Sequence, residues 1–475
     1  MKQLFPVLAL LFLGCTVDDD SSVDLSSKSR IARIENSLTP VLQIEGQEKP
    51  TYNINVRLEE LGIPGLSVAF AVNGAVRWSK AYGMADVSDR QPVSTDTMFL
   101  AGSISKPVAA VRAHQLVEEG TFDLDEDINN YLTSWQVPEN EFTAKEKVTL
   151  RRILNHTAGL TVWGFPGYDK GDDIPGVVDV LEGRGNTDPV RVFREPGKAW
   201  LYSGGGYTVM QLAIADKEGV AFPETMQRNV LDRMNMQGST FENPLPAEYH
   251  ALAATGYRVN GDEVEGNWPI YPEMAAAGLW TTPGELIQYA IEVQRILQSG
   301  QDGILKHGTV VEMLVAGEED WGLGPEVTEH TFRHGGSDEG FRASLIAWQE
   351  EPYAAVVMVN SDNGSIIGEL LLSIAKEYGL PDIEPVVREL IVVGQEVLER
   401  YVGRYETQES GPVEISLIND HLSLYLDDWD ERFIILPQTE SQFFHSVNGS
   451  LVDFDVKNGV VYGFEWQGER AERVN

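Results

Sequence analysis

Cysteine is almost absent from this 475-residue chain, because Cys15 is the only one. A single thiol excludes an intramolecular disulfide and a cysteine cluster for metal binding, so stability must come from the hydrophobic core. Basic residues are also scarce, with 36 Lys and Arg against 73 Asp and Glu and a formal net charge of −37. This imbalance argues against nucleic acid or anionic lipid headgroups as partners.

Several catalytic and cofactor-binding motifs are missing as well. The sequence contains no Gly-x-Ser-x-Gly, no His-Glu-x-x-His and no glycine-rich phosphate loop. The first absence disfavours an α/β-hydrolase, and the others leave no metal ion, nucleotide or other cofactor implied. The N-terminal apolar run from Leu4 to Leu13 is too short to span a bilayer.

The first 30 residues are typical of an export and tethering segment. One Lys precedes the apolar run and Gly14-Cys15 follows it, a pattern that resembles the lipobox of bacterial lipoproteins. Residues 1–15 are then a lipoprotein signal peptide, Cys15 is the lipid attachment site, and the acidic stretch 16–30 is a tether. The alternative is an ordinary cleaved signal that contains a cysteine. The protein is expected to be exported to the bacterial cell envelope, touching the membrane only through this anchor.

The segment from Ala101 to Pro107 offers a hydroxyl and an amine three residues apart. A helical pattern of apolar residues follows, and Gly120 is placed to end it. Because three residues is close to one turn, the Ser103 hydroxyl and the Lys106 amine are expected to lie within reach of each other. A lysine held neutral by burial could take the proton of the serine, and N–H groups at the helix start could hold an oxyanion. The alternative is a helix cap followed by a solvated lysine.

The order of strand and helix patterns predicts an α+β fold. Two strand-like runs flank Asn73-Gly74, strands return at 341–348 and 354–360, and a helix follows at 366–378. Helices inserted between the first and last strands of one sheet indicate an antiparallel sheet flanked by helices, with a helical subdomain. The segment 163–200, rich in Gly, Pro and aromatic residues, is expected to be a loop bordering a cleft.

Four motifs carry a resemblance to a known family. They are Ser103-Ile104-Ser105-Lys106, Leu154-Asn155-His156-Thr157-Ala158-Gly159-Leu160, Tyr202-Ser203-Gly204 and His334-Gly335-Gly336-Ser337. Their order resembles that of the serine β-lactamase and penicillin-binding-protein superfamily, most closely the class C β-lactamase-related serine hydrolases. The resemblance implies a β-lactamase/transpeptidase-like domain over residues 31–384 and a small-molecule or peptide substrate.

The resemblance also implies a role for each motif. Ser103 is the nucleophile that becomes acylated, Lys106 is its proton acceptor or electrostatic partner, and Tyr202 is a general base. For that role the pKa of Tyr202 must fall from about 10, and Lys106 is expected to lower it. His334 matches a catalytic lysine on an edge strand that lines the cleft, and the N–H groups of Ser103 and Ser337 form the oxyanion hole.

Two positions depart from the family pattern. Gly204 stands where an asparagine usually contacts the substrate amide, and His334 replaces a fixed positive charge. Binding of a β-lactam carboxylate is thus less favoured, although Arg342 could substitute, and Gly336 lets substrate approach the strand closely. A D-amino-acid peptidase, DD-peptidase or esterase is therefore favoured over a β-lactamase. A catalytically slow penicillin-binding or sensing protein is a further alternative.

Other motif-like residues have simpler interpretations. Ser361-Asp362-Asn363 spells the second box of class A β-lactamases but follows His334-Gly335-Gly336 instead of preceding it, so it is interpreted as a turn and helix cap. Lys306-His307-Gly308 precedes a helical pattern, and His156 is expected to be a structural loop residue. One aromatic set either walls the cleft or packs within its loop: Trp163, Phe165 and Tyr168.

The C-terminal part follows a different pattern from about Tyr401. Strand-like runs occur at 414–418, 421–426, 431–436, 442–446, 451–457 and 460–466. Short strands joined by tight turns predict a small all-β barrel or sandwich. Residues 396–475 resemble the lipocalin-like domain often appended to these hydrolases, and nothing in them is typical of catalysis.

Overall fold

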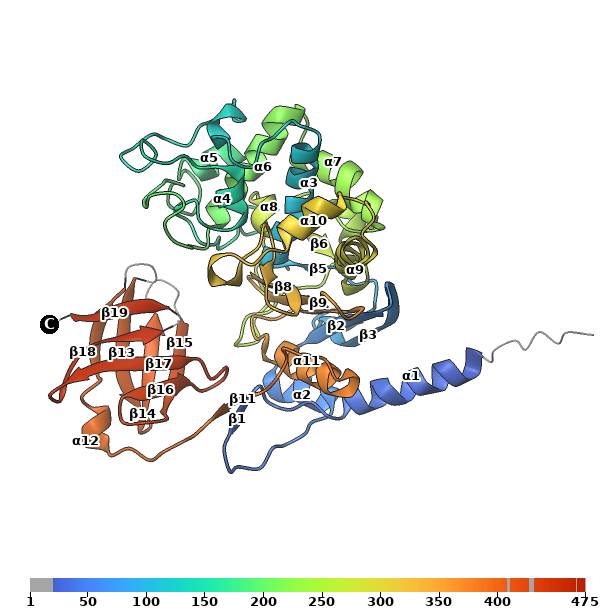
Figure 1. The fold of residues 1–475 in the computed structure, drawn as a ribbon. Coiled ribbons are helices and arrows are strands. Elements are labelled where there is room, and N and C mark those ends of the chain that lie inside the picture. Colours follow the sequence, from blue (N-terminus) through green and yellow to red (C-terminus); the bar gives the residue numbers. More distant parts are fainter. Residues whose placement is uncertain (1–19, 408–410, 427–430, 467, 475) are drawn as a thin grey trace, which may run out of the picture.

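The computed structural model describes residues 20–407, 411–426, 431–466 and 468–474. A seven-stranded antiparallel sheet lies at the centre of the first part of the chain (Figure 1), in the order β4-β3-β2-β10-β9-β8-β7. The strands are β2 Gly65–Val72, β3 Ala75–Asp86, β4 Gln91–Pro92, β7 Glu326–Val327, β8 Thr331–Asp338, β9 Phe341–Trp348 and β10 Tyr353–Val359. Because β2 pairs with β10, the first hairpin joins the last strands in one sheet, which confirms the predicted α+β fold.

Two hydrophobic layers cover the faces of this sheet. Successive residues of a strand point to opposite faces, so Val68 and Phe70 join one core while Ala69 and Ala71 join the other. The helices against the first face are α1 Asp20–Glu35, α2 Ile54–Leu61 and α11 Ser365–Tyr378. Helix α9, Pro283–Ser299, packs on the second face.

A helical subdomain is inserted between two short strands, β5 Phe99–Leu100 and β6 Trp280–Thr281, which pair with each other. Its helices are η1 Gly102–Ile104, α3 Ser105–Glu118, η2 Ile128–Asn130, α4 Leu150–Leu154, α5 Val177–Leu181, α6 Gly204–Glu218, α7 Phe222–Met226, η3 Gln227–Leu231, η4 Asp232–Met234, η5 Ala247–Tyr249 and α8 Met274–Ala277. After β6 and α9 come α10 His307–Met313 and η6 Glu318–Asp320. The helix predicted after Lys306-His307-Gly308 is therefore present.

The N-terminal predictions fall partly outside the described residues. Cys15 and the predicted signal peptide 1–15 lie there, as do residues 16–19. The expected tether 16–30 is helical from Asp20, because α1 begins at that residue. Ile31 and Ile34 bury the end of α1 in the first core, and a helix anchored at one end propagates into the preceding residues. Within the described residues, no helix combines the length and apolarity needed to cross a membrane.

Eight consecutive strands close into an up-and-down barrel at the C-terminus (Figure 1). They are β12 Gly403–Glu406, β13 Pro412–Ile418, β14 His421–Leu426, β15 Glu431–Pro437, β16 Gln442–His445, β17 Leu451–Lys457, β18 Val460–Trp466 and β19 Glu469–Val474. Six were predicted. The two that were missed, β12 and β19, pair with each other and close the barrel. Tyr405, Phe443, Phe454 and Phe464 fill its interior.

A short connection ties the barrel to the rest of the chain. Strand β11, Val386–Arg388, pairs in parallel with β1, Leu42–Ile44, and α12, Gln395–Leu398, precedes the barrel. Arg388 Nε donates a hydrogen bond to the Gly449 carbonyl oxygen in the barrel at 2.8 Å. The connection is therefore held to β1 by main-chain pairing and to the barrel by the side chain of Arg388.

Candidate active site

Ser103 lies on a tight turn that is pressed against strand β8, beyond the residues of β8 that pair with β7. It belongs to η1, immediately ahead of α3. Gly102 has a φ of +53°, and a Cβ there would overlap the Ser337 main-chain nitrogen. A Cβ at Gly336 on β8 would overlap the Ala101 carbonyl oxygen. Only glycine permits so close an approach of two backbones, so these two positions seat the serine beside the strand.

Lys106 lies one helical turn after Ser103 and is 2% exposed. Its Nζ contacts the Ser103 Oγ at 3.0 Å and donates to the carbonyl oxygen of Ala276 in α8 at 2.9 Å. Burial lowers the pKa of Lys106 to about 7, and the nearby Asp338 carboxyl opposes that shift. At neutral pH a large fraction of this lysine is therefore neutral and able to accept a proton from the serine.

Tyr202 lies beside the same pair, but in a different electrostatic state from the one expected. Burial raises the pKa of Tyr202 well above its usual value, although the neighbouring Ser103 hydroxyl opposes the shift. Lys106 Nζ lies over the face of the ring, 4.9 Å from its centre, and does not lower this pKa. The expected lowering is wrong, because complete burial of the phenol disfavours its charged form. Tyr202 is a neutral phenol at physiological pH.

His156 supports Tyr202 from behind. The two rings are stacked with their centres 4.2 Å apart. The Ser203 main-chain N–H donates to His156 Nδ1 at 3.1 Å, and burial lowers the pKa of His156 well below its usual value. The neutral imidazole thus holds the segment that carries Tyr202 ahead of α6, in line with the structural role expected for this motif.

His334 is buried next to the site rather than exposed in it. Its Nδ1 lies 2.6 Å from the Gly335 carbonyl oxygen, which makes Nδ1 the protonated nitrogen, and its ring packs edge-on against Trp321. Burial, followed by repulsion from Lys106, lowers the pKa of His334 to about 3. His334 is therefore neutral at physiological pH, supplies no positive charge, and is not among the residues that line the pocket. The structure does not support a direct catalytic contact for it.

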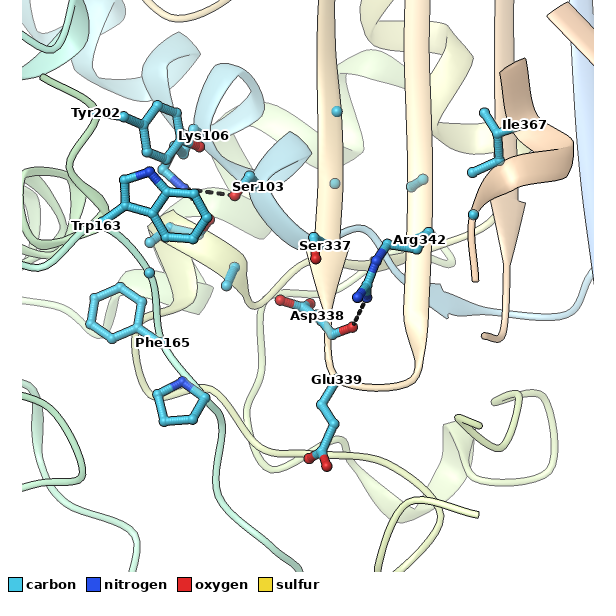
Figure 2. A pocket seen from close by; sticks show the side chains of 18 of the residues that line it. Ser103, Lys106, Trp163, Phe165, Tyr202, Ser337, Asp338, Glu339, Arg342 and Ile367 are labelled. Carbon is cyan, nitrogen blue, oxygen red and sulfur yellow. Dashed lines mark hydrogen bonds between the residues drawn. The ribbon is translucent and has the colours of Figure 1, made fainter. Parts of the chain in front are cut away.

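An open pocket of about 910 Å³ lies in front of Ser103. Figure 2 shows Ser103 and Lys106 on one side, with Ser337, Asp338 and Arg342 on the facing strands. Its aromatic wall comes largely from the 163–200 loop, as predicted. The aromatic residues that line the pocket are Trp163, Phe165, Trp200, Tyr202 and Trp321.

Of the other residues predicted to form the site, some line the pocket and others lie outside it. Gly336 and Ser337 line the pocket, whereas Gly204 does not. Gly204 begins α6 in a packed position, where a Cβ would come within 2.8 Å of the Phe165 ring. Packing therefore accounts for the glycine at this position, which stands outside the set of residues that line the pocket. Tyr168 is also outside the pocket, buried in its loop.

Arg342 lines the pocket, but one of its nitrogens is engaged by the protein. Its Nη1 lies 2.9 Å from the Asp362 carboxylate and donates to the Asp338 main-chain carbonyl at 2.6 Å. Asp362 belongs to the segment that was predicted to form a turn and a helix cap. At the start of α11, the Ser365 N–H donates a hydrogen bond to Asn363 Oδ1 at 3.1 Å, as a cap would. A substrate carboxylate would therefore meet an arginine that is already paired.

Sequence reasoning missed two contributors to the site. Ala276 holds Lys106 through its carbonyl oxygen, and no side-chain pattern could reveal a main-chain acceptor. Asp338 lines the pocket directly after the fourth motif, His334 to Ser337. Its signal was present in the sequence, because an acidic Asp338-Glu339 pair follows Ser337 without interruption.

A family model described as Beta-lactamase matches residues 52–369, which include all four motifs. The chain belongs to this family. The β-lactamase-family protein is 21% identical over 440 residues to Penicillin-binding protein 4* of Bacillus subtilis strain 168, covering 84% of this chain and 91% of that one. It is 25% identical over 231 residues to the Teichoic acid D-alanine hydrolase of Staphylococcus aureus, covering 48% and 54%.

Comparison with solved structures supports the same fold. The crystal structure of D-amino acid amidase from Ochrobactrum anthropi SV3, complexed with L-phenylalanine amide, aligns with a TM-score of 0.56 at 20% identity. The alignment covers 68% of this chain and 97% of that one. Residues 393–474, which contain the barrel, match a family described as a domain of unknown function, DUF3471.

Proposed function

We propose that this β-lactamase-family protein is a serine hydrolase that forms an acyl-enzyme on Ser103, and that its substrates are peptides, amides or esters of D-amino acids. The 3.0 Å contact between a buried Lys106 Nζ and the Ser103 Oγ carries the proposal. That pair opens onto a pocket large enough for a small molecule or the end of a peptide. A D-alanine hydrolase and a D-amino acid amidase among the similar proteins support the substrate class.

The proposed reaction has two halves. Ser103 Oγ attacks the substrate carbonyl while its proton passes to neutral Lys106 Nζ, and the main-chain N–H groups of Ser103 and Ser337 hold the oxyanion. The proton then passes to the leaving amine or alcohol as its bond to the acyl carbon breaks, with the neutral Tyr202 phenol beside Ser103 as a hydrogen-bond relay. In the second half, water attacks the acyl carbon while Lys106 takes its proton, and Lys106 returns that proton to Ser103 Oγ as the bond between Oγ and the acyl carbon breaks.

A β-lactamase is the second candidate, because Arg342 lines the pocket and could meet a substrate carboxylate. Two observations weigh against it. His334 is neutral, and Arg342 is already paired with Asp362. A fixed carboxylate on the substrate would therefore gain little from the charges of this pocket.

A substrate panel tests the ranking. We expect kcat/KM for a D-alanyl p-nitroanilide or a p-nitrophenyl ester to exceed that for a chromogenic cephalosporin by about 10²-fold, the selectivity that a few contacts provide. Steady-state turnover of the purified protein measures this. Cephalosporin turnover far above the others would make the protein a β-lactamase. Covalent labelling without turnover of any substrate would favour a binding or sensing protein.

We also propose that the chain is exported and anchored in the cell envelope through a lipid on Cys15, on the strength of the apolar run and Gly14-Cys15. Cells fed an alkyne-tagged fatty acid should label the wild-type protein and not Cys15→Ser. The variant should also leave the membrane fraction. Equal labelling of both proteins would contradict the assignment of Cys15.

A further inference from the structure

Asp338 stands at the end of β8, inside the pocket and directly after Ser337. Its side chain is 5% exposed, and its Oδ2 has no hydrogen-bond partner among the described residues. Figure 2 shows it beside Ser337 and Arg342, at the end of the strand that lies next to Ser103. A buried carboxyl with an unpartnered oxygen costs free energy, so its position calls for a partner that function supplies.

The neighbouring charges already have partners. Glu339 pairs with Arg258 at 2.5 Å, and Arg342 pairs with Asp362 at 2.9 Å. Lys106 directs its amine at the Ser103 Oγ and the Ala276 carbonyl. Within the described residues, no side-chain cation lies at ion-pair distance from the Asp338 carboxyl. Asp338 is thus the unmatched acidic group of this pocket.

The unmatched carboxyl lies beside the position where the scissile carbonyl would sit. It follows Ser337, whose main-chain nitrogen faces the nucleophile turn, and the Gly102 N–H faces the carboxyl itself. In an aminoacyl substrate, the α-nitrogen is attached one carbon away from the carbonyl that Ser103 attacks. An α-amine on the substrate is therefore expected to lie near the end of β8, where Asp338 lines the same pocket as Ser103.

We propose that Asp338 binds the free α-ammonium group of the substrate, so that the enzyme prefers unblocked aminoacyl amides and esters over N-acylated ones. This inference rests on the proposed function and narrows its substrate class. The ammonium donates to the otherwise unpartnered Oδ2 while Ser103 attacks the adjacent carbonyl.

Proton balance is compatible with this pairing. Burial raises the pKa of Asp338 to about 8, although the charges of Lys106 and Arg342 oppose the shift. The α-amino group of a substrate titrates at about 8 as well. Near that pH a neutral amine and a neutral carboxyl can meet and transfer one proton between them, so no net uptake or release of protons is needed.

The test compares D-alanine p-nitroanilide with N-acetyl-D-alanine p-nitroanilide on the full chain. We expect the wild type to favour the unblocked substrate by about 10²-fold in kcat/KM, the usual weight of a buried hydrogen bond to a charged group. In Asp338→Asn the ratio of the two values should fall by at least about 10-fold. Glu339→Gln is the matched control, because its carboxyl is the next residue but is already paired, and it should keep the wild-type ratio.

A second measurement needs no variant of Asp338. D-alaninamide should protect wild-type Ser103 from a fluorophosphonate probe at concentrations where N-acetyl-D-alaninamide does not. If Asp338→Asn fails to fold, this comparison still tests whether the wild-type site recognises the α-ammonium group.

Three results would overturn the inference. An unchanged ratio in Asp338→Asn, with both substrates slowed equally, would make Asp338 a positioning residue for the Gly102 turn only. Equal protection by the two amides would exclude ammonium recognition. A wild type that hydrolyses p-nitrophenyl acetate through Ser103 but ignores the α-amine would refute the inference and leave the proposed function intact. Failure to label Ser103 or to turn over any substrate would refute the proposed function itself.

Discussion

Replacing Ser103 by alanine is expected to lower kcat/KM at least about 10⁴-fold on every substrate that the enzyme turns over. The reason is that Ser103 supplies the hydroxyl that Lys106 Nζ contacts, at 3.0 Å, and that faces the pocket. Without that oxygen no acyl-enzyme can form. Intact mass after treatment with a fluorophosphonate should show one adduct on the wild type and none on Ser103→Ala.

Ser105→Ala is the matched control for this experiment. Ser105 lies two residues further along the same turn, but its hydroxyl is buried and accepts a hydrogen bond from the Leu279 N–H at 3.0 Å. It should therefore keep the adduct. An adduct that persists on Ser103→Ala, or that disappears only from Ser105→Ala, would place the nucleophile elsewhere.

Replacing Lys106 by methionine is expected to lower kcat by about 10²–10⁴-fold, the usual yield of a positioned general base. In the wild type, kcat/KM for p-nitrophenyl acetate, which carries no α-amine, should rise with pH to a plateau with a midpoint near 7, because only the neutral Lys106 amine accepts the serine proton and burial lowers the pKa of Lys106 to about 7. This limb should vanish in Lys106→Met. A pH–rate profile of both proteins measures the effect.

Replacing Lys106 by methionine should lower activity without lowering stability at neutral pH. The pKa of Lys106 is lower in the folded chain than in the unfolded one, so between the two values the unfolded chain binds more protons. The wild type should therefore gain stability relative to Lys106→Met as pH rises from about 7 to about 10, and at pH 7 the variant should be at least as stable. Chemical denaturation at several pH values checks this, and a variant that unfolds more easily at pH 7 would contradict the cost assigned to the buried amine.

Tyr202→Phe serves as the comparison for the lysine variant. Its phenol is neutral, so we expect a loss of only about 10-fold, and the pH limb near 7 should remain. A limb that disappears in Tyr202→Phe and persists in Lys106→Met would reverse the assignment of the base.

Much of the fold and the nucleophile could be predicted from local sequence. The Asn73-Gly74 turn, in which both residues take positive φ, joined β2 to β3 as the dipeptide indicated. The contact between Ser103 and Lys106 follows from their spacing, because residues three apart share one face of a helical turn whatever surrounds them. Six barrel strands were visible as strand-like runs, whereas β19 was not, since four of the six residues in its sequence ERAERV are charged.

The chemistry of the site depended on contacts that no local pattern encodes. The sequence determined which residues carry a hydroxyl, an amine or a phenol, and their order along the chain. Only the tertiary structure decided that Lys106 is buried against Ala276, that Tyr202 is a neutral phenol, and that Asp338 has an unpartnered oxygen. The physical reason is that a pKa is set by desolvation and by nearby charges, and here both come from segments far apart in the chain that pack around one serine.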